Sequence, residues 1–143
     1  MSELPVIADP HRNVLVVVVD DSKTIRRSAE VFLTQAGYKV LLVDDGFKAL
    51  GTIVDSQPQI VFVDVMMPRL DGYQTCSLIK RNPEFSQVPV IMLTSKDGLF
   101  DRARGKLAGC DDYLVKPFTR EALIDVIDRH VVQVLPNGAA PLR

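Results

Sequence analysis

Residues 13–21 read NVLVVVVDD, an apolar run that ends in two adjacent aspartates. Four similar short runs follow: 39–43 (KVLLV), 60–63 (IVFV), 90–93 (VIML) and 113–115 (YLV). The first, third and fourth of the five runs are apolar throughout and do not alternate with polar residues. Such runs are typical of strands that are covered on both faces in a parallel sheet.

Amphipathic stretches with helical spacing separate these runs and follow the last one. Their apolar positions are Ile25, Ala29, Phe32, Leu33 and Ala36; Phe47, Leu50, Ile53 and Val54; Tyr73, Cys76 and Ile79; Leu99, Ala103 and Leu107; and Leu123, Val126, Ile127, His130 and Val134. The chain therefore alternates strand and helix five times. Right-handed crossovers fold this pattern into an α/β three-layer sandwich with a five-stranded parallel sheet. The flavodoxin-like strand order 2-1-3-4-5 fits five strands best.

Composition indicates a single globular domain. The 143 residues are 47% hydrophobic and 24% charged, with a formal net charge of −1, which excludes a disordered chain and argues against a broad nucleic-acid footprint. We expect a folded unit over residues 13–134, with proline-containing tails at 1–12 and 135–143. No apolar run is long enough for a membrane span and no secretory signal is visible, so a cytoplasmic location is expected. Cys76 and Cys110 lack CxxC spacing and are expected to be reduced.

Polar side chains follow four of the predicted strands. Asp20 and Asp21 follow the first, Asp64 the third, Thr94 and Ser95 the fourth, and Lys116-Pro117 the fifth. In an open parallel sheet, ligands bind just beyond the carboxyl ends of the strands. The predicted strand order therefore brings three carboxylates, a hydroxyl and an ammonium to one small volume.

Three close carboxylates either take up protons or bind a cation. Oxygen ligands without histidine or thiolate favour Mg²⁺, and a carboxylate beside that ion can accept a phosphoryl group. A structural alternative exists for single members, because an aspartate or serine after a strand often caps the next helix. Asp21 or Ser22 could have only this structural role. We also expect residues 44–46 and 111–112 to be loops of this kind, and we assign them no catalytic role.

Four segments resemble the receiver domain of two-component response regulators in order and spacing: VVVVDDSKTIRR, IVFVDVMMPRLDGYQ, VIMLTSKDG and DDYLVKPF. The resemblance spans residues 13–134. It implies that Asp64 is the phosphoacceptor and that Mg²⁺ is held by Asp20, Asp21, Asp64 and the backbone carbonyl of Met66. It further implies roles for Thr94 as the switch hydroxyl, Lys116 as the phosphate-pairing lysine and Tyr113 as the aromatic switch residue. The Lys116-Pro117 peptide bond is then expected to be cis.

In more detail, three segments resemble those of the single-domain regulators of the type IV pilus (twitching motility) chemosensory system: DDSKTIRR, MMPRLDGYQTC and SKDGLFDRARGK. This resemblance implies a histidine kinase as phosphodonor and a protein partner downstream, such as the pilus extension machinery or a scaffold. From the near-zero net charge and the short apolar runs, we expect no nucleic-acid partner and no membrane insertion. We expect a monomer, with dimerisation on activation as an option.

Other functions compete with a signalling switch. A phosphate sink has the same chemistry without an output partner, and the sequence does not separate the two. A Mg²⁺-dependent phosphatase with an aspartyl nucleophile is disfavoured, because no second acid/base carboxylate follows Asp64 at short spacing. We therefore expect no enzyme activity beyond self-phosphorylation and autodephosphorylation. A nucleotide or flavin module is weaker still, because no GxGxxG or GxxxxGK[ST] loop follows the first strand.

Overall fold

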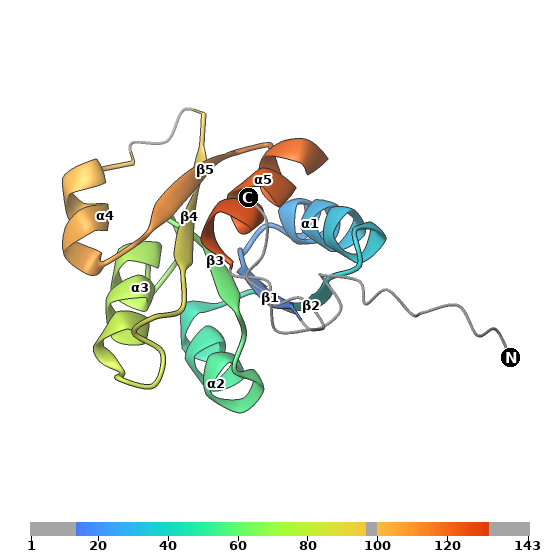
Figure 1. Cartoon of the computed structure of the whole chain (residues 1–143). Coiled ribbons are helices and arrows are strands. Elements are labelled where there is room, and N and C mark those ends of the chain that lie inside the picture. Colours follow the sequence, from blue (N-terminus) through green and yellow to red (C-terminus); the bar gives the residue numbers. More distant parts are fainter. Residues whose placement is uncertain (1–13, 97–99, 132–143) are drawn as a thin grey trace, which may run out of the picture.

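The computed structural model describes residues 14–96 and 100–131, where five strands alternate with five helices (Figure 1). The strands are β1 (Leu15–Val19), β2 (Lys39–Val43), β3 (Ile60–Asp64), β4 (Val90–Ser95) and β5 (Asp112–Lys116). The helices are α1 (Lys23–Gln35), α2 (Gly46–Ser56), α3 (Gly72–Arg81), α4 (Arg102–Ala108) and α5 (Arg120–His130). Within the described ranges, no helix is both long and apolar enough to cross a membrane. The predicted tails, Asn13, Leu99 and Val134 lie outside these ranges.

The five strands form one parallel sheet in the order β2-β1-β3-β4-β5, so the predicted topology is confirmed. The register pairs Asp64 with Leu93 and, one strand further, Ser95 with Lys116. The carboxyl ends of β1, β3, β4 and β5 therefore meet at one edge of the sheet, which is where the sequence places its polar cluster.

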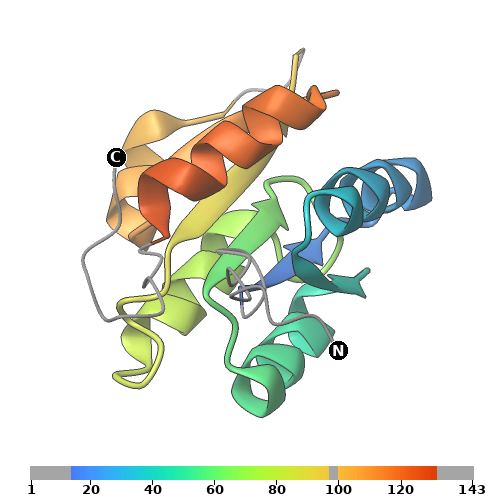
Figure 2. The ribbon, with the colours of Figure 1, turned by 45° about the vertical axis from the view of Figure 1, so that its right-hand side comes forward.

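Helices cover both faces of the sheet, with α1 and α5 on one face and α2, α3 and α4 on the other (Figure 2). Valines of β1 alternate between the two cores: Val16 and Val18 pack under α1 and α5, and Val17 and Val19 under the other layer. Because both faces are covered, an apolar residue is needed at every position, which explains the unbroken run. Burial of each such side chain contributes roughly 1.5–3 kcal/mol.

A polar side chain caps the first turn of each helix, where the backbone N–H groups have no intrahelical acceptor. Ser22 accepts from the Ile25 amide at 3.3 Å, and Asp71 forms a reciprocal capping box with Gln74. The other caps are Asp45 on α2, Asp101 on α4 and Thr119 on α5. Ser22, not Asp21, is the cap of α1, which leaves Asp21 available for the polar cluster.

The predicted apolar stripe of α4 is wrong. Ala103 is exposed and Leu107 is 88% exposed, whereas the buried residue of this helix is Gly105. A Cβ added at Gly105 would lie 2.9 Å from Cζ of Phe100 and 3.0 Å from Sγ of Cys110. The backbone of α4 therefore approaches its neighbours through the glycine, and the larger apolar residues turn outward.

Two smaller expectations also differ from the structure. Phe47 and Val54 of α2 are about half exposed, because Ala49 and Ile53 make the buried contacts of this helix. Asp112 is not a helix cap but the first residue of β5, where its carboxylate accepts from Nε2 of His130 at 2.9 Å. This contact ties the start of β5 to the end of α5.

Candidate functional site

Three aspartates meet beyond the carboxyl ends of β1 and β3. Carboxylate oxygens of Asp20, Asp21 and Asp64 all lie within 4.8 Å of one another. Asp20 is fully buried and Asp64 is 4% exposed, whereas Asp21 is exposed and opens the pocket to solvent. The site predicted from the ends of the strands is thus assembled around these three residues, and its hard oxygen donors are of the kind that Mg²⁺ prefers.

Lys116 completes this cluster from the end of β5. Its Nζ lies 2.9 Å from Oδ2 of Asp20 and 3.1 Å from Oδ1 of Asp64, so one ammonium bridges two buried carboxylates. The Lys116-Pro117 peptide bond is cis, as expected. Since the Lys116 side chain is only 13% exposed, it contacts the carboxylates with little competition from water.

Burial and crowding shift the titration of this cluster. Burial, followed by the charge of Asp20, raises the pKa of Asp64 to about 7, and the opposing effect of Lys116 is smaller. Burial also acts to lower the pKa of Lys116, but hydrogen bonding and attraction to Asp20 and then Asp64 raise it overall. The cluster therefore holds more negative charge than one ammonium neutralises, which favours a proton or an added cation.

Backbone amides two residues further along the chain hold the two buried carboxylates in place. Oδ1 of Asp20 accepts from the Ser22 amide at 2.8 Å, and Oδ1 of Asp64 accepts from the Met66 amide at 3.2 Å. A Cβ on Gly72 would lie 2.4 Å from the Asp64 carbonyl oxygen, so only glycine lets α3 begin this close to β3. The Met66 side chain is 74% exposed, and this residue belongs to the site only through its backbone.

Arg26 is a site residue that sequence reasoning missed. This residue of α1 is partly buried, and its Nη1 donates to the Asp20 carbonyl oxygen at 2.6 Å. The only sequence signal was its place six residues after Asp20, which brings it back over the β1–α1 turn.

Thr94 and Tyr113 occupy different surroundings. Thr94 is buried at the end of β4, and its Oγ1 donates weakly to the Ser95 carbonyl oxygen at 3.4 Å. In the sheet register it pairs with Val115, two residues after Tyr113. The Tyr113 ring packs instead against Phe100, 5.0 Å between centroids, and under the guanidinium of Arg102. The Tyr113 hydroxyl is also a hydrogen-bond partner of Arg102.

Phe100 joins two tyrosines into a column of aromatic rings. Its ring stacks on Tyr73 of α3 at 6.1 Å and 8°, and its other contact is Tyr113 of β5. The Tyr73 hydroxyl accepts from the amide of Asp101, the cap of α4, at 2.8 Å. Phe100 is therefore a partly buried link between α3, the start of α4 and β5.

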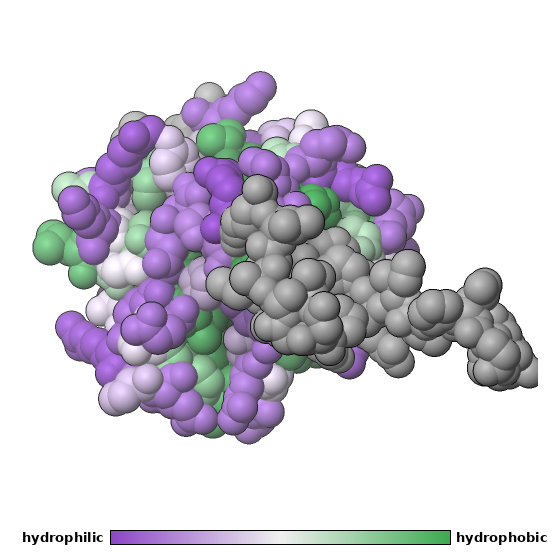
Figure 3. All heavy atoms as spheres, in the orientation of Figure 1, coloured by the Kyte–Doolittle hydropathy of each residue, from purple (hydrophilic) through white to green (hydrophobic). Residues whose placement is uncertain are grey.

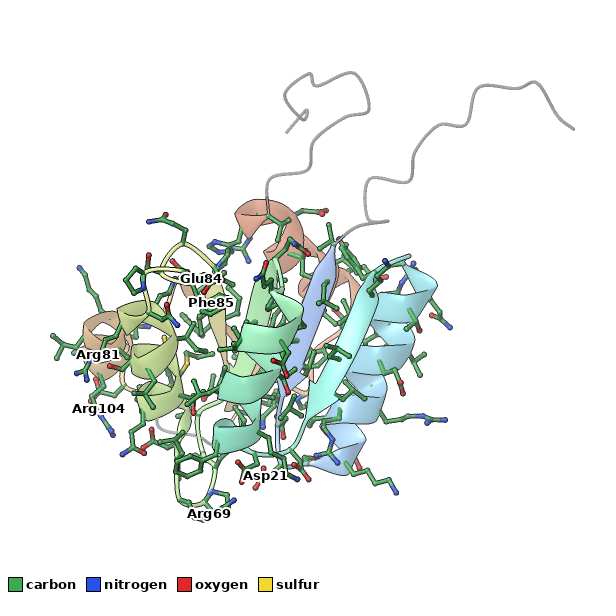
Figure 4. The ribbon with its side chains drawn as sticks, turned by 90° about the horizontal axis from the view of Figure 1, so that it is seen from below. Asp21, Arg69, Arg81, Glu84, Phe85 and Arg104 are labelled. Atoms are coloured by element: carbon green, nitrogen blue, oxygen red, sulfur yellow. The ribbon has the colours of Figure 1, made fainter. Side chains whose placement is uncertain are left out.

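A second group of residues borders the pocket on the side of α2. Arg69, in the loop between β3 and α3, has a left-handed backbone (φ 68°) and pairs with the carboxylate of Asp45. Its guanidinium also lies over the Phe47 ring, 5.5 Å from the centroid. Figure 4 shows Arg69 and Asp21 at the same end of the molecule. Nothing in the sequence pattern predicted this contact, because it depends on the direction of side chains in two loops.

Comparison with known proteins relates this chain to a protein family. Residues 16–128 match the model of the response regulator receiver domain. The chain is 58% identical over 124 residues to Protein PilG of Pseudomonas aeruginosa, a match that covers 87% of this chain and 92% of that protein. It is also 41% identical over 111 residues to Response regulator MprA of Mycobacterium sp. (strain KMS), of which it covers 47%.

Solved structures agree. The fold is similar to the chemotaxis protein CheY4 of Vibrio cholerae, with a TM-score of 0.78 and 30% identity over 82% of this chain and 98% of that one. It is also similar to the receiver domain of the sensor histidine kinase PA1611 of Pseudomonas aeruginosa, crystallised with a magnesium ion in its active site cleft. That match has a TM-score of 0.75 and 32% identity over 82% of this chain and 96% of that one. The chain belongs to the response regulator receiver domain family of two-component signalling.

Proposed function

We propose that Asp64 accepts a phosphoryl group from a histidine kinase and that the modified domain changes its protein partner. The observation that supports this most is the placement of a buried carboxylate beside two further aspartates and one bridging ammonium. An Asp64 oxygen attacks the phosphorus of a phosphohistidine. An O–P bond forms as the N–P bond breaks, and the imidazole nitrogen leaves with the electron pair.

Each neighbour of Asp64 has a proposed part in this transfer. Asp20, Asp21, Asp64 and the Met66 carbonyl would hold Mg²⁺, which would supply positive charge to offset that of the phosphoryl group. The ammonium of Lys116 pairs with one of those oxygens in exchange for its contact to Asp64. The hydroxyl of Thr94 turns from the Ser95 carbonyl to donate to another, since its present hydrogen bond is long and easily given up.

The proposed switch follows from the Thr94 movement. When the hydroxyl and its loop move toward the phosphoryl group, Tyr113 can leave its contact with Phe100 and turn inward. To move such an equilibrium from 1:99 to 99:1, the phosphoryl group must favour the active state by about 5.5 kcal/mol. New contacts of Thr94 and Lys116 to the phosphoryl oxygens are the source of that difference.

Labelling with a small phosphodonor tests the phosphoacceptor. Wild-type protein should acquire a phosphoryl group that hydroxylamine and base remove, as expected of an acyl phosphate, and Asp64→Asn should acquire none; persistent acid-stable labelling would contradict an aspartyl phosphate. Asp55→Asn, which changes an exposed carboxylate on α2, is the matched control. Wild-type labelling of Asp64→Asn would remove Asp64 from this role.

Magnesium titration tests the metal ligands. Asp21→Ala should lose Mg²⁺ binding and keep its fold, because Asp21 is exposed and its removal takes one negative charge out of a crowded cluster. Isothermal titration with Mg²⁺ measures the binding, and circular dichroism checks the fold. Unchanged Mg²⁺ affinity in this variant would contradict the proposed site.

A phosphate sink is the alternative to a switch. Amide exchange with and without beryllofluoride, an acyl phosphate mimic, separates the two. A switch predicts changes at Thr94, Phe100 and Tyr113, whereas a sink predicts changes confined to the neighbourhood of Asp64 and Asp21.

We further propose, from the resemblance to pilus chemosensory regulators and the 58% identity to Protein PilG, that the output concerns type IV pilus motility. We place this signalling in the cytoplasm and propose no turnover of external substrates. Pull-down of the beryllofluoride-treated and untreated protein, scored for pilus-motor and scaffold proteins, tests the output.

A further inference from the structure

A groove of about 440 Å³ lies between α3 and α4, away from the acidic pocket. Apolar side chains from both helices line it, among them Leu78, Leu107 and Tyr73, and Ser77 and Arg81 add polar groups. Leu107 is 88% exposed and Leu78 is 40% exposed. Single exposed leucines are common on protein surfaces, but here apolar groups from two helices converge on one concave site.

The close approach of Gly105 explains why this groove is open. Since α4 packs against Phe100 and Cys110 through a residue without a side chain, only the small Ala108 at its end packs against the core, and Leu107 does not. Leu107 is thereby held outward over the groove by a rigid backbone contact. The hydrophobic surface over α4 in Figure 3 has hydrophilic side chains above and below it.

The rim of the groove is positively charged. The seven residues of α4 include Arg102, Arg104 and Lys106 and no acid, and α3 ends in Arg81. Figure 4 shows Arg81 and Arg104 on the same side of the molecule. Arg104 pairs with Asp71 only at 3.8 Å and stays 58% exposed. Among the residues described by the structure, Arg81 and Lys106 have no carboxylate within ion-pair distance.

We propose that the α3–α4 groove binds an acidic amphipathic helix of a partner protein. Apolar residues at i, i+4 and i+7 of that helix would pack on Leu78 and Leu107, and flanking glutamates or aspartates would face Arg81, Arg104 and Lys106. A groove between two helices suits a helix, whereas an extended strand pairs with the free edge of a sheet. A second copy of this chain fits poorly, because a symmetric contact would bring like-charged rims together. This proposal does not depend on phosphorylation of Asp64.

The test uses a designed peptide of about 16 residues, helical, with leucines at i, i+4 and i+7 and glutamates on both flanks. Binding to the unphosphorylated full chain is measured from amide chemical shifts. We expect the largest shifts in α3 and α4 and an affinity that falls with added salt. Because Leu107 is 88% exposed and the bound helix would bury it, Leu107→Glu should weaken binding about tenfold or more. Val54→Glu, at a position of α2 that is 53% exposed, should leave peptide binding unchanged.

Charge exchange gives a second arm that loss of folding cannot imitate. Arg81→Glu should lower the affinity for the acidic peptide. It should raise the affinity for a peptide that has lysines in place of the glutamates facing residue 81. The proposal is overturned if acidic and basic peptides bind alike, if Leu107→Glu has no effect, or if the shifts map to another face. It is equally overturned if Leu107→Glu abolishes self-association in sedimentation, or if anionic vesicles of phosphatidylserine bind this face and the peptide does not.

Discussion

Replacement of Asp64 by asparagine should stabilise the metal-free protein at pH 8. Asparagine keeps the shape of the side chain and removes one of the charges that Lys116 cannot neutralise. The pKa of Asp64 rises from 3.8 to about 7 on folding, first because of burial and then because of Asp20. Between these values the native state holds the proton more tightly than the unfolded chain, so the free energy of unfolding falls as pH rises through this window.

The magnitude follows from the shift. A change of about 3 pKa units corresponds to about 4 kcal/mol as an upper limit. The pocket opens to solvent at Asp21, and screening there reduces the expected gain of Asp64→Asn to roughly 1–3 kcal/mol at pH 8. For a chain of this size, that is a rise in melting temperature of roughly 3–10 °C.

Urea unfolding in EDTA at several pH values between 5 and 8 measures the effect. The difference between Asp64→Asn and wild type should shrink as pH falls toward 5, and Asp55→Asn should match wild type throughout. Added Mg²⁺ should stabilise the wild type but not Asp64→Asn, because ligand that binds only the native state adds to its stability. If Asp64→Asn is no more stable than wild type at pH 8, or if the difference is independent of pH, the electrostatic account of the pocket is incorrect.

Three further predictions concern the bridging lysine, the buried glycine of α4 and the two cysteines. Lys116→Met should destabilise the metal-free protein at pH 8 by about 3 kcal/mol in urea unfolding, because it leaves two buried carboxylates without their cation. Gly105→Ala should cost about 1–3 kcal/mol by overpacking, whereas Gly51→Ala, with nothing within 4 Å of its added Cβ, should gain about 0.5–1 kcal/mol. The thiols of Cys76 and Cys110 should react slowly with iodoacetamide at pH 8 in the folded protein. The reason is that burial raises the pKa of Cys76 to about 12 and that of Cys110 above its usual value. Rapid alkylation of either thiol would contradict this.

The sheet and the acidic pocket were predictable because both follow from short-range pattern and topology. Apolar runs place the strands, right-handed crossovers restrict their order, and the residue after each run lies at the carboxyl edge. Asp20, Asp64 and Lys116 therefore converge, although 96 residues separate the first from the last. No knowledge of side-chain packing is needed for this step.

Packing of α4 was not predictable by the same means. Periodicity assumes that the largest apolar residues of a helix face the core, but close backbone approach at Gly105 reverses this for Leu107. The contact of Arg26 with the Asp20 carbonyl and that of Arg69 with Asp45 depend on side-chain direction at loops. A linear pattern of apolar and charged residues carries no information on that direction.

One residue belongs to both the groove and the aromatic column. Tyr73 lines the groove, stacks on Phe100 and accepts a hydrogen bond from the cap of α4, and Phe100 contacts Tyr113. If phosphorylation of Asp64 moves Tyr113, the groove changes with it. Linkage then requires reciprocity: whatever factor beryllofluoride applies to the affinity for the acidic helix, the helix must apply to the affinity for beryllofluoride. Tyr73→Leu keeps an apolar wall on the groove but removes the ring and hydroxyl. In this variant beryllofluoride should no longer change the affinity for the acidic helix, and the helix should no longer change the affinity for beryllofluoride.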